Sequence, residues 1–324
     1  MTKNPLPLLS HYVRHKAFEE VQAAISGLLN TKDPRSGCII PFLGTTRLGK
    51  SDVIRRLARD STPAKTLVPT QSFVKADLPA QVSSKGIYAT MLSATGLKSR
   101  AGDTASSTRS RLFRAIDQYG IQTIALDECN HVVERGSNLS ARAAADHFKT
   151  VVDETGVNLI LLGLPRFQQI IDNNEQLRDR ACGTILLKPY DWQNDGDRDA
   201  FCGAVASVLD SLEASGITVD LEFEDLVRRL YGASGGRIPM MMRMMKLCIL
   251  QAGSSVHLTI VDFRRAARSM QQSGIPISLF FENEDPDEVE LIRSFAAIMA
   301  EAGLDFEVDT LAGLEVAWGN KAAS

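Results

Sequence analysis

The chain has 324 residues, of which 44% are hydrophobic and 23% charged, as expected for a folded globular protein of one large or two modest domains. Its formal net charge of −3 means that any affinity for DNA must come from a local basic patch. No run of about 18 apolar residues occurs, and the first residues lack the pattern of a secretory signal, so we expect a cytoplasmic protein that does not span a membrane. The five cysteines are widely spaced and form no CxxC pair, which argues against a zinc site or a disulfide framework.

Strands and helices alternate through the first 190 residues. Helical periodicity first appears over residues 11–29. The predicted strands are 38–43, 67–74, 121–126, 157–162 and 184–187, and the helices between them are 50–59, 84–96, 107–119 and 141–154. A loop rich in Gly, Ser and Thr is expected over 98–109. This alternation predicts an α/β fold with a parallel sheet that is covered on both faces.

The pattern changes after Pro189. From Trp192 to about Met270 the sequence predicts only helices, with turns near residues 215, 235 and 254. An acidic stretch and a helix near 288–302 follow, and together they would suit a basic partner. We therefore divide the chain into an N-terminal arm and helix (1–36), an α/β core (37–190), a helical lid (191–270) and a partner-docking tail (271–324).

A glycine-bearing loop after the first predicted strand fits the pattern GxxxxGK[ST] at every fixed position. The glycines let backbone N–H groups turn toward phosphate oxygens, the lysine supplies a cation for the β and γ phosphates, and the last hydroxyl binds Mg²⁺. The alternative is a chance match in a loop, but a strand before it and a helix after it favour a nucleotide site. The residues assigned to ATP are Gly44, Thr45, Thr46, Arg47, Leu48, Gly49, Lys50 and Ser51.

A second motif, Thr123 to Glu128, is an apolar strand that ends in two carboxylates. Asp127 is expected to hold Mg²⁺ together with Ser51, as the second acid of a P-loop site does. Glu128 is expected to be the catalytic base that polarises the attacking water. Taken alone, the pair fits an acidic strand end that caps the next helix equally well. The phosphate-binding pattern upstream favours the catalytic interpretation.

Two arginines, Arg178 and Arg180, lie between the fourth and fifth predicted strands. In ring-forming ATPases this region faces the nucleotide of the neighbouring subunit, where an arginine stabilises charge on the γ phosphate. We favour Arg180 as this catalytic arginine and keep Arg178 as the second candidate. The alternative is a solvated helix end in which these side chains pair with Glu175 or Asp179.

A glycine turn over 235–236 opens another predicted helix in the second half of the chain. Arg237 follows this turn and is expected to reach the nucleotide from the lid and sense its phosphates, with Arg243 as the second candidate. The alternative for Arg237 is an ordinary residue at a helix start. We interpret the methionines between 240 and 245 as flexible core filling rather than as a binding surface.

Basic residues gather around the 98–109 loop, with serines and threonines between them and one acid, Asp103. Such a segment can contact DNA phosphates without reading bases. The alternative is a solvated, mobile loop. A second polar loop, 134–142, would line the same channel, and nearby His131 is expected to make a local structural hydrogen bond. The candidate DNA contacts are Lys85, Lys98, Arg100, Arg109, Arg135 and Arg142.

The order of these motifs resembles that of AAA+ ATPases, and more specifically that of the TniB/TnsC transposition regulators. The P-loop by itself indicates only the superfamily, whereas the combination indicates the family. The resemblance covers residues 10 to 270. Three stretches carry it: His15 to Leu29 leading into Ile39 to Gly44 and the P-loop; Leu126 to His131, similar to an IDE-x-H pattern; and Leu226 to Leu250, with Tyr231-Gly-Ala-Ser-Gly-Gly-Arg-Ile.

The resemblance implies an AAA+ P-loop core with a small all-helical lid, and an ATPase that uses ATP and Mg²⁺ as an assembly switch. It implies a homo-oligomer, a ring or filament of about six or seven subunits per turn, on double-stranded DNA. It also implies two protein partners, a TniQ-type targeting protein and a TnsA/TnsB-type transposase. Members with CRISPR-associated transposons connect a guide-RNA complex to the transposase, and this short chain is similar to those compact members.

Two features depart from the family pattern. The fourth strand of AAA+ proteins usually ends in a polar residue that senses the γ phosphate, whereas residues 161–165 read Leu-Leu-Gly-Leu-Pro, so slow or differently coordinated hydrolysis is expected. The tail after 270 has no counterpart. The alternative function is a nucleotide-switched signalling or scaffold ATPase without a DNA role, which the near-neutral charge favours. A third possible function is that of an initiator or clamp-loader type AAA+ protein. No winged-helix pattern follows residue 270 to support an initiator.

Overall fold

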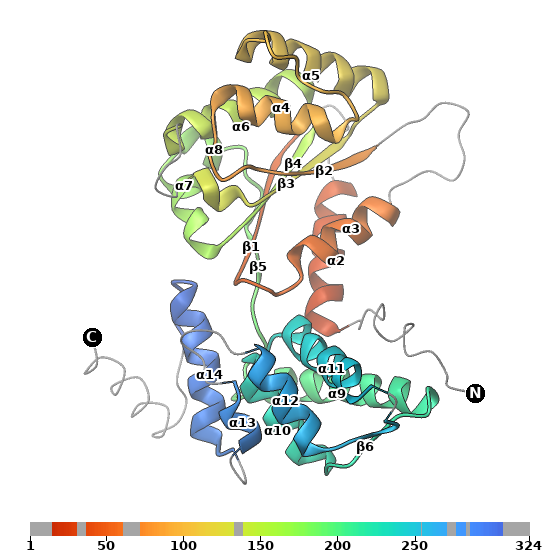
Figure 1. The fold of residues 1–324 in the computed structure, drawn as a ribbon. Helices are drawn as coiled ribbons and strands as arrows, with labels where there is room; N and C mark the ends of the chain where they lie inside the picture. Colours follow the sequence, from red (N-terminus) through yellow and green to blue (C-terminus); the bar gives the residue numbers. More distant parts are fainter. Residues whose placement is uncertain are drawn as a thin grey trace. The chain divides into compact units, whose positions relative to one another are not determined.

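The computed structural model describes residues 15–30, 37–60, 72–132, 139–253, 255–270, 277–282 and 286–306. The chain forms two compact units (Figure 1). The first is Ala17–Leu187. The second combines the described residues before Ala17 with those after Leu187. Among the described residues, no helix has the length and apolar character needed to cross a membrane.

A five-stranded parallel sheet organises the first unit, in the order β2-β3-β4-β1-β5. Almost every residue of β1, β3 and β4 is buried, as expected for central strands of a sheet covered on both faces. The predicted fold class is confirmed. The strands are β1 (Ile39–Gly44), β2 (Phe73–Asp77), β3 (Thr123–Asp127), β4 (Asn158–Gly163) and β5 (Ile185–Leu187).

Alternate side chains of the strands point to opposite faces of the sheet and belong to two separate hydrophobic cores. Ile39 and Leu43 of β1 pack with α4, α5 and α6, whereas Ile40 and Phe42 pack with α2 and α3. This is the two-sided cover that continuous apolar strands require (Figure 1). The helices are α2 (Lys16–Asn30), α3 (Lys50–Asp60), α4 (Ser84–Ala94), α5 (Ala105–Tyr119), α6 (Ala141–Thr155), α7 (Gln168–Asp172) and α8 (Glu175–Arg178), with 3₁₀ turns η1 (Cys129–Val132) and η2 (Pro165–Phe167).

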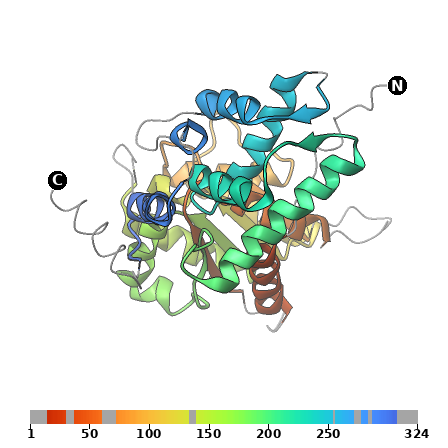
Figure 2. The same cartoon turned by 90° about the horizontal axis from the view of Figure 1, so that it is seen from below.

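The second unit is built mainly of helices, which Figure 2 shows from below. They are α9 (Asp195–Ala214), α10 (Phe223–Ser234), α11 (Ile238–Ala252), α12 (Ile260–Met270), α13 (Leu279–Glu282) and α14 (Glu288–Glu301). The expectation of helices alone was wrong in one respect, because β6 (Thr218–Val219) pairs in parallel with β7 (His257–Leu258). Strands of two residues are too short to show alternation in a sequence.

Two predicted boundaries also differ from the structure. Strand β2 begins at Phe73, later than the predicted 67–74 strand, and residues 61–71 lie outside the described part of the chain. Helix α5 begins at Ala105, so the predicted 98–109 loop is shorter and Arg109 lies on a helix. The cause is a capping box, in which Thr104 Oγ1 accepts from Ser107 N and Ser107 Oγ accepts from Thr104 N.

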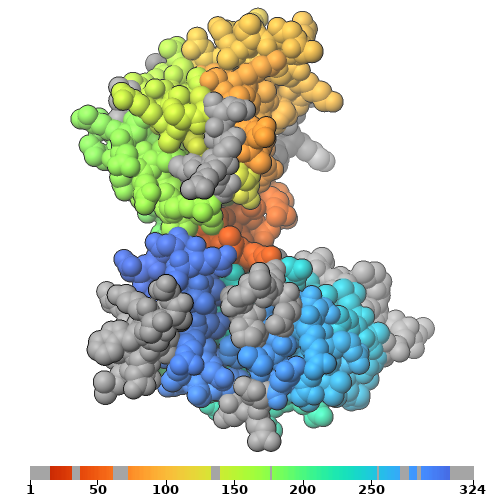
Figure 3. All heavy atoms as spheres, turned by 60° about the vertical axis from the view of Figure 1, so that its left-hand side comes forward, coloured from red at the N-terminus to blue at the C-terminus, as the bar shows by residue number. Residues whose placement is uncertain are grey.

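The described part of the predicted tail belongs to the helical unit. Phe281 of α13 stacks on Phe263 of α12 with 5.6 Å between ring centroids, and Ser294 of α14 is bonded to α10. On the face drawn in Figure 3, α14 (dark blue) and α12 (lighter blue) both contribute to the surface of this unit. Residues 277–282 and 286–306 of the predicted tail thus lie in the same compact unit as the predicted lid, with the apolar side of α14 buried against α10, and the boundary at 270 stays a prediction.

One partly buried histidine makes the stability of the second unit depend on pH. His15 Nδ1 lies 2.9 Å from Tyr190 Oη, and burial lowers the pKa of His15 from 6.5 to about 4. Because the unfolded chain takes up this proton below pH 6.5 and the folded protein does not, stability falls as the pH drops from 6.5 toward 4. Between pH 7.5 and 5, the wild type should lose about 2 kcal/mol more unfolding free energy than His15→Gln.

Urea denaturation at the two pH values measures this difference. His257→Gln is the matched control, because His257 lies on the exposed side of the short strand β7 in the same unit. Between the two pH values, His257→Gln should lose as much unfolding free energy as the wild type does. Equal losses in the wild type and in His15→Gln would contradict the assignment of the pH effect to His15.

Candidate nucleotide-binding site

The predicted phosphate-binding loop connects β1 to α3 at the carboxyl edge of the sheet. A methyl group on Gly44 would lie 2.6 Å from Leu187 O, so only glycine fits between β1 and β5. Arg47 (φ 60°) and Gly49 (φ 88°) both have left-handed backbone, and Gly49 O accepts from the amides of Asp52 and Val53 in the first turn of α3. Left-handed residues of this kind turn successive N–H groups toward one side of a loop, as anion binding requires.

Lys50 is the first residue of α3, and its side chain folds back over the loop. Its Nζ donates to Gly44 O at 2.7 Å and to Thr45 O at 2.8 Å. Burial lowers the pKa of Lys50 to about 8, while Asp127 and Glu128 raise it in part. The ammonium is therefore poorly hydrated, and a phosphate anion at the loop would stabilise its charged form.

Thr45 adds a second polar group to the loop. Its side chain is 1% exposed, and Oγ1 has no hydrogen-bond partner among the described residues. A buried hydroxyl without a partner costs free energy, and a ligand that bonds to it removes that cost. Leu48 anchors the same loop by packing into the core beside α2 and α3, whereas Thr46 and Arg47 are exposed.

The predicted magnesium ligands lie in direct contact. Ser51 Oγ donates to Asp127 Oδ2 at 2.5 Å, which brings together the first turn of α3 and the end of β3. Burial alone would raise the pKa of Asp127, but hydrogen bonds from Ser51 and Lys75 outweigh it and lower the pKa. Asp127 is thus ionised at neutral pH. A hydroxyl beside a carboxylate, with phosphate oxygens and water, is a donor set that suits Mg²⁺.

Lys75 belongs to the same site, although the sequence analysis did not identify it. It lies on β2, next to β3 in the sheet, and its Nζ is 3.0 Å from Asp127 Oδ2 and also pairs with Asp77. Burial alone would lower the pKa of Lys75, but the bonds to Asp77 and Asp127 outweigh it and raise the pKa. Lys75 therefore stays charged and holds one oxygen of Asp127. The signal in the sequence is Lys-Ala-Asp at a strand end, and it lies just beyond the predicted 67–74 strand.

Glu128 has an unusual backbone at the end of β3. Its φ of 59° is left-handed, and its N–H donates to Asp127 Oδ1 at 2.9 Å. This conformation is uncommon for a residue with a side chain and is found most often at functional sites. The Glu128 side chain is exposed, unlike that of Asp127. The next turn is held by His131, whose Nδ1 lies 3.1 Å from Leu78 O, so its structural bond is made to a residue 53 positions away and not to a local one.

The two candidate catalytic arginines differ in their surroundings. Arg180 Nε donates to Asp153 Oδ1 at 2.5 Å, and this bond raises the pKa of Arg180 further. Arg178 is exposed and makes a longer contact, 3.5 Å, with Asp172 O. The ion-pair partner of Arg180 is thus on α6, 27 residues away, so inspection of neighbouring residues could not find it. The choice between the two arginines stays a prediction.

The candidate lid arginine belongs to the second unit. Arg237 is 5% exposed, precedes α11, and donates from Nε to Ser234 O at 2.8 Å. Arg243 is exposed on α11. The methionines at 240, 241, 242, 244 and 245 are all buried, which confirms that they fill the core. The sensing role of Arg237 stays a prediction.

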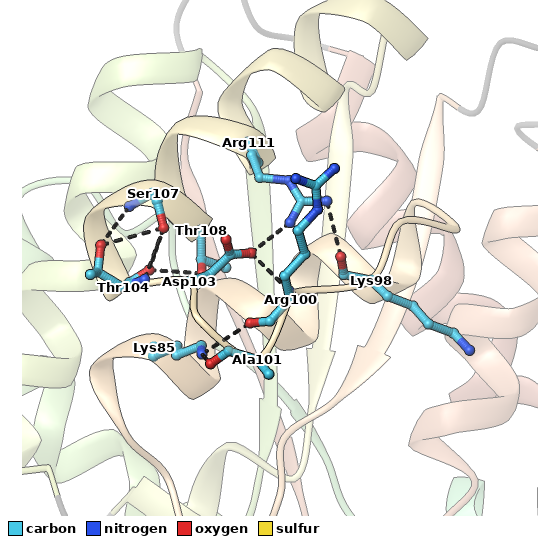
Figure 4. A network of polar contacts seen from close by, with 9 residues as sticks. All are labelled: Lys85, Lys98, Arg100, Ala101, Asp103, Thr104, Ser107, Thr108 and Arg111. Atoms are coloured by element: carbon cyan, nitrogen blue, oxygen red, sulfur yellow. Dashed lines mark hydrogen bonds and ion pairs between the residues drawn. The ribbon is translucent and has the colours of Figure 1, made fainter.

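Some of the candidate DNA contacts form one hydrogen-bonded network (Figure 4). Asp103 Oδ2 accepts from Arg100 N at 2.8 Å and from Arg111 Nη1 at 2.6 Å, and Arg111 Nη2 donates to Lys98 O at 3.0 Å. Lys85 Nζ lies 3.4 Å from Arg100 O. These bonds fix the backbone of the loop, while the side chains of Lys98 and Arg100 are exposed.

The other candidate contacts lie outside this network. Arg109 lies on α5 beside Tyr88, whose hydroxyl is 3.0 Å from His147 Nδ1. Arg142 is exposed and lines a separate cavity of about 540 Å³ between α6 and the α7–α8 region. Arg135 lies outside the described residues. The structure thus brings together Lys85, Lys98 and Arg100 from the predicted set.

Solved structures with a similar fold share little sequence with this chain. The Aeropyrum pernix ORC2 protein, solved as ADPNP-ADP complexes, is 14% identical with a TM-score of 0.58, covering 95% of this chain and 82% of that one. The Aeropyrum pernix ORC1 protein in complex with DNA is 13% identical with a TM-score of 0.57, covering 96% and 84%. The Walker-type ATPase PabY2304 of Pyrococcus abyssi is 15% identical with a TM-score of 0.55, covering 95% and 92%. These likenesses show an AAA+ fold.

No curated protein matches the sequence. The pattern of one protein family does match it, over residues 9–187, and that family is described as Bacterial TniB protein. The match covers more than half of the chain, including the phosphate-binding loop, both acids at the end of β3 and the two candidate catalytic arginines. The chain therefore belongs to the TniB family.

Proposed function

We propose that this chain is an ATP-dependent, DNA-binding AAA+ regulator of DNA transposition. It assembles as a ring or filament on duplex DNA and links a TniQ-type targeting protein to a TnsA/TnsB-type transposase. The observation that carries the proposal is the convergence of Lys50, Ser51, Asp127 and Glu128 at one edge of the sheet in a chain of the TniB family.

ATP and Mg²⁺ fit the residues at this edge. The loop amides, Lys50 and Thr45 would hold the phosphates, and Ser51 with Asp127 would hold Mg²⁺, which neutralises charge on the β and γ phosphates. Glu128 would act as the base toward water, because its exposed carboxylate follows directly on the metal-binding acid. Asp127 is already aligned by Ser51 and Lys75, so little reorganisation is needed when the nucleotide binds.

DNA binding is supported by the fixed loop of α4 and α5. Lys98 and Arg100 are exposed on a backbone that Asp103 and Arg111 hold in place, so two cations are presented with little loss of chain entropy. Cations of this kind bind DNA phosphates in a salt-dependent way without reading sequence. The structurally similar Aeropyrum pernix ORC1 protein was solved in complex with DNA, which is consistent with this use of the fold.

Assembly would complete the catalytic site through an arginine from the neighbouring subunit. Arg180 is the stronger candidate, because Asp153 holds its guanidinium in one orientation at the start of the segment that leads to β5. A charge-assisted bond of this geometry keeps a long side chain ordered. Replacing Arg178 by Ala is the control for Arg180→Ala, and it should leave assembly-dependent ATP turnover nearly unchanged.

The direct test is the size of the full-length protein with duplex DNA, measured by light scattering and negative-stain imaging with and without ATP. Rings or filaments that form on DNA only with ATP support the proposal. A protein that binds ATP yet stays monomeric with DNA contradicts the assembly role and leaves the nucleotide site intact.

Reversing two charges of the basic loop should weaken DNA binding. Lys98→Glu with Arg100→Glu removes two phosphate contacts, so affinity for duplex should fall by about tenfold to a hundredfold at low salt, with a salt slope smaller by about 2. Fluorescence anisotropy with a duplex of random sequence, repeated over a series of salt concentrations, measures the affinity and the salt slope. Nucleotide affinity should not change.

Arg265→Glu with Arg268→Glu is the matched control, because it makes the same change in net charge on exposed side chains of α12. It should leave duplex binding nearly intact. If both double variants weaken binding equally, the effect is one of global charge and the basic loop is not a DNA-binding surface.

A second candidate function is a nucleotide-switched scaffold ATPase without a DNA role. Two observations favour it: the net charge of −3, and the internal pairing of Arg111 with Asp103, which neutralises part of the basic loop. In that case ATP-dependent assembly persists in the Lys98/Arg100 variant, and duplex affinity is absent in the wild type as well.

A further inference from the structure

The turn that precedes Arg237 is fixed on one side by the segment around Tyr190. Gly235 (φ 57°) and Gly236 (φ 75°) are both left-handed, and Gly235 N donates to Tyr231 O at 2.6 Å to end α10. Tyr190 N donates to Gly236 O at 3.0 Å, and a methyl group on Gly236 would lie 2.1 Å from Tyr190 O. The two backbones are therefore in direct contact on this side, with no room for a side chain at Gly236.

The C-terminal helices fix the opposite side of the same turn. A methyl group on Gly235 would lie 1.9 Å from Ile298 Cδ1 of α14, and one on Gly232 would lie 2.2 Å from Phe280 Cδ1 of α13. Ser294 Oγ of α14 donates to Gly232 O at 2.5 Å. Ser294 and Ile298 are 6% and 1% exposed, so both contacts lie in the interior. The end of α10 is thus enclosed by α13 and α14.

Two arginines of α10 hold the segment that leads into α14. Arg229 is 5% exposed and donates from Nη1 to Phe280 O at 2.8 Å while its Nε pairs with Asp225. Arg228 Nη2 donates to Pro286 O at 2.7 Å. Charge-assisted bonds to backbone carbonyls are strong in buried sites. They bind the segments on either side of residues 283–285 to α10.

We propose that Ile298 and Ser294 are positioning residues for Arg237, so that α14 sets how the chain responds to nucleotide. The inference rests on the proposed nucleotide role of Arg237. The path is short: α14 contacts Gly232 and Gly235, and Arg237 follows two residues after Gly235 and donates back to Ser234 O. A small displacement of a positioned cation lowers its contribution to phosphate binding and turnover severely. A partner that moves α14 would change the nucleotide response by the same route.

The test compares Ile298→Ala, Ser294→Ala and Arg237→Ala in the full-length protein. Affinity for a fluorescent ATP analogue, KM for ATP and kcat are measured for each, with Ile298→Val and Ser294→Thr as milder variants that keep the contact in part. Arg237→Ala should weaken ATP binding or turnover by about 10- to 100-fold, and Ile298→Ala by about 3- to 30-fold. The double variant Ile298→Ala/Arg237→Ala should be no worse than Arg237→Ala, because both act through one group.

Ile292→Ala is the matched control. Ile292 is also buried on α14, but at 3.6 residues per turn it points about 120° away from Ile298 and about 160° away from Ser294. It should lower stability to urea as Ile298→Ala does and leave KM and kcat unchanged. Equal kinetic losses in the two variants, or independent losses in the double variant, overturn the inference.

The role of Arg237 and the role of α14 are distinguished by these variants. If Arg237→Ala has no effect on nucleotide, the proposed role of Arg237 is wrong and the inference is overturned with it. If Arg237→Ala has its effect while Ile298→Ala and Ser294→Ala behave as wild type, the role of Arg237 stands and α14 does not position it.

Discussion

Replacing Glu128 by Gln should abolish ATP turnover while ATP binding is kept. The amide is nearly isosteric with the carboxylate but cannot accept the proton of the attacking water, so kcat should fall by about 100- to 10,000-fold. Because Glu128 is exposed and contacts Asp127 through its backbone N–H, the substitution should leave the phosphate loop and Asp127 in place. ATP would then persist in the site, and DNA-bound assemblies should accumulate. A phosphate-release assay measures the loss of turnover, and light scattering with ATP and duplex DNA measures the accumulation of assemblies.

Glu154→Gln is the matched control for this prediction. Glu154 is exposed near the end of α6, so the same chemical change is made away from the site. It should hydrolyse ATP at the wild-type rate. A Glu128→Gln protein that turns over ATP normally would contradict the assignment of the base, and one that fails to bind ATP would show that Glu128 is needed for the structure of the loop.

Replacing Lys50 by Ala should remove most of the affinity for ATP. Lys50 is the partly buried cation of the predicted phosphate loop. Its loss leaves the anion without a charge-assisted partner in a poorly hydrated site, so affinity should fall by about 100-fold or more. Isothermal titration calorimetry with Mg-ATP measures the loss. Arg55→Ala, on the exposed side of α3, is the control and should bind as wild type. Unchanged affinity in Lys50→Ala would contradict the P-loop assignment.

The lowered pKa of Lys50 adds a pH dependence to the same experiment. Below pH 8 the lysine is charged before ATP arrives, whereas above pH 8 binding must also take up a proton, since phosphate stabilises the charged form. ATP affinity should therefore weaken above about pH 8, by up to tenfold per pH unit. Lys50→Ala should lack this slope. A wild-type affinity that is constant from pH 7.5 to 9.5 would contradict the assignment.

The candidate nucleotide site could be identified where its chemistry depends on consecutive residues. Phosphate binding requires glycine, lysine and hydroxyl at fixed places in one loop, and the acid pair directly follows an apolar strand. Both stretches were located by sequence alone, and the structure brings Ser51 to within 2.5 Å of Asp127 across 76 residues of chain. The alternation of strands and helices was equally local, which is why the parallel sheet was expected correctly.

Contacts between distant segments could not be predicted in this way. Lys75 reaches Asp127 only because β2 and β3 are neighbours in the sheet, and Arg180 meets Asp153 only because α6 passes nearby. Lys-Ala-Asp at the end of β2 marks Lys75 in the sequence, but no local pattern identifies Asp127 as the partner of Lys75 or Asp153 as the partner of Arg180. The start of α5 does have a local cause, a capping box formed by Thr104 and Ser107. Serine stands there in place of the usual Glu or Gln, so the stretch resembles a loop in the sequence.

The second unit is discontinuous along the chain, since His15 and Lys16 join the residues that follow Leu187. During synthesis these N-terminal residues leave the ribosome long before Tyr190, the partner of His15, has been made. The Ala17–Leu187 unit can fold first, as N-terminal domains generally do. The final arrangement around His15 must then form late, after the C-terminal helices have emerged. A fragment that begins at Lys188 would lack this contact, so the helical unit is completed only by the whole chain.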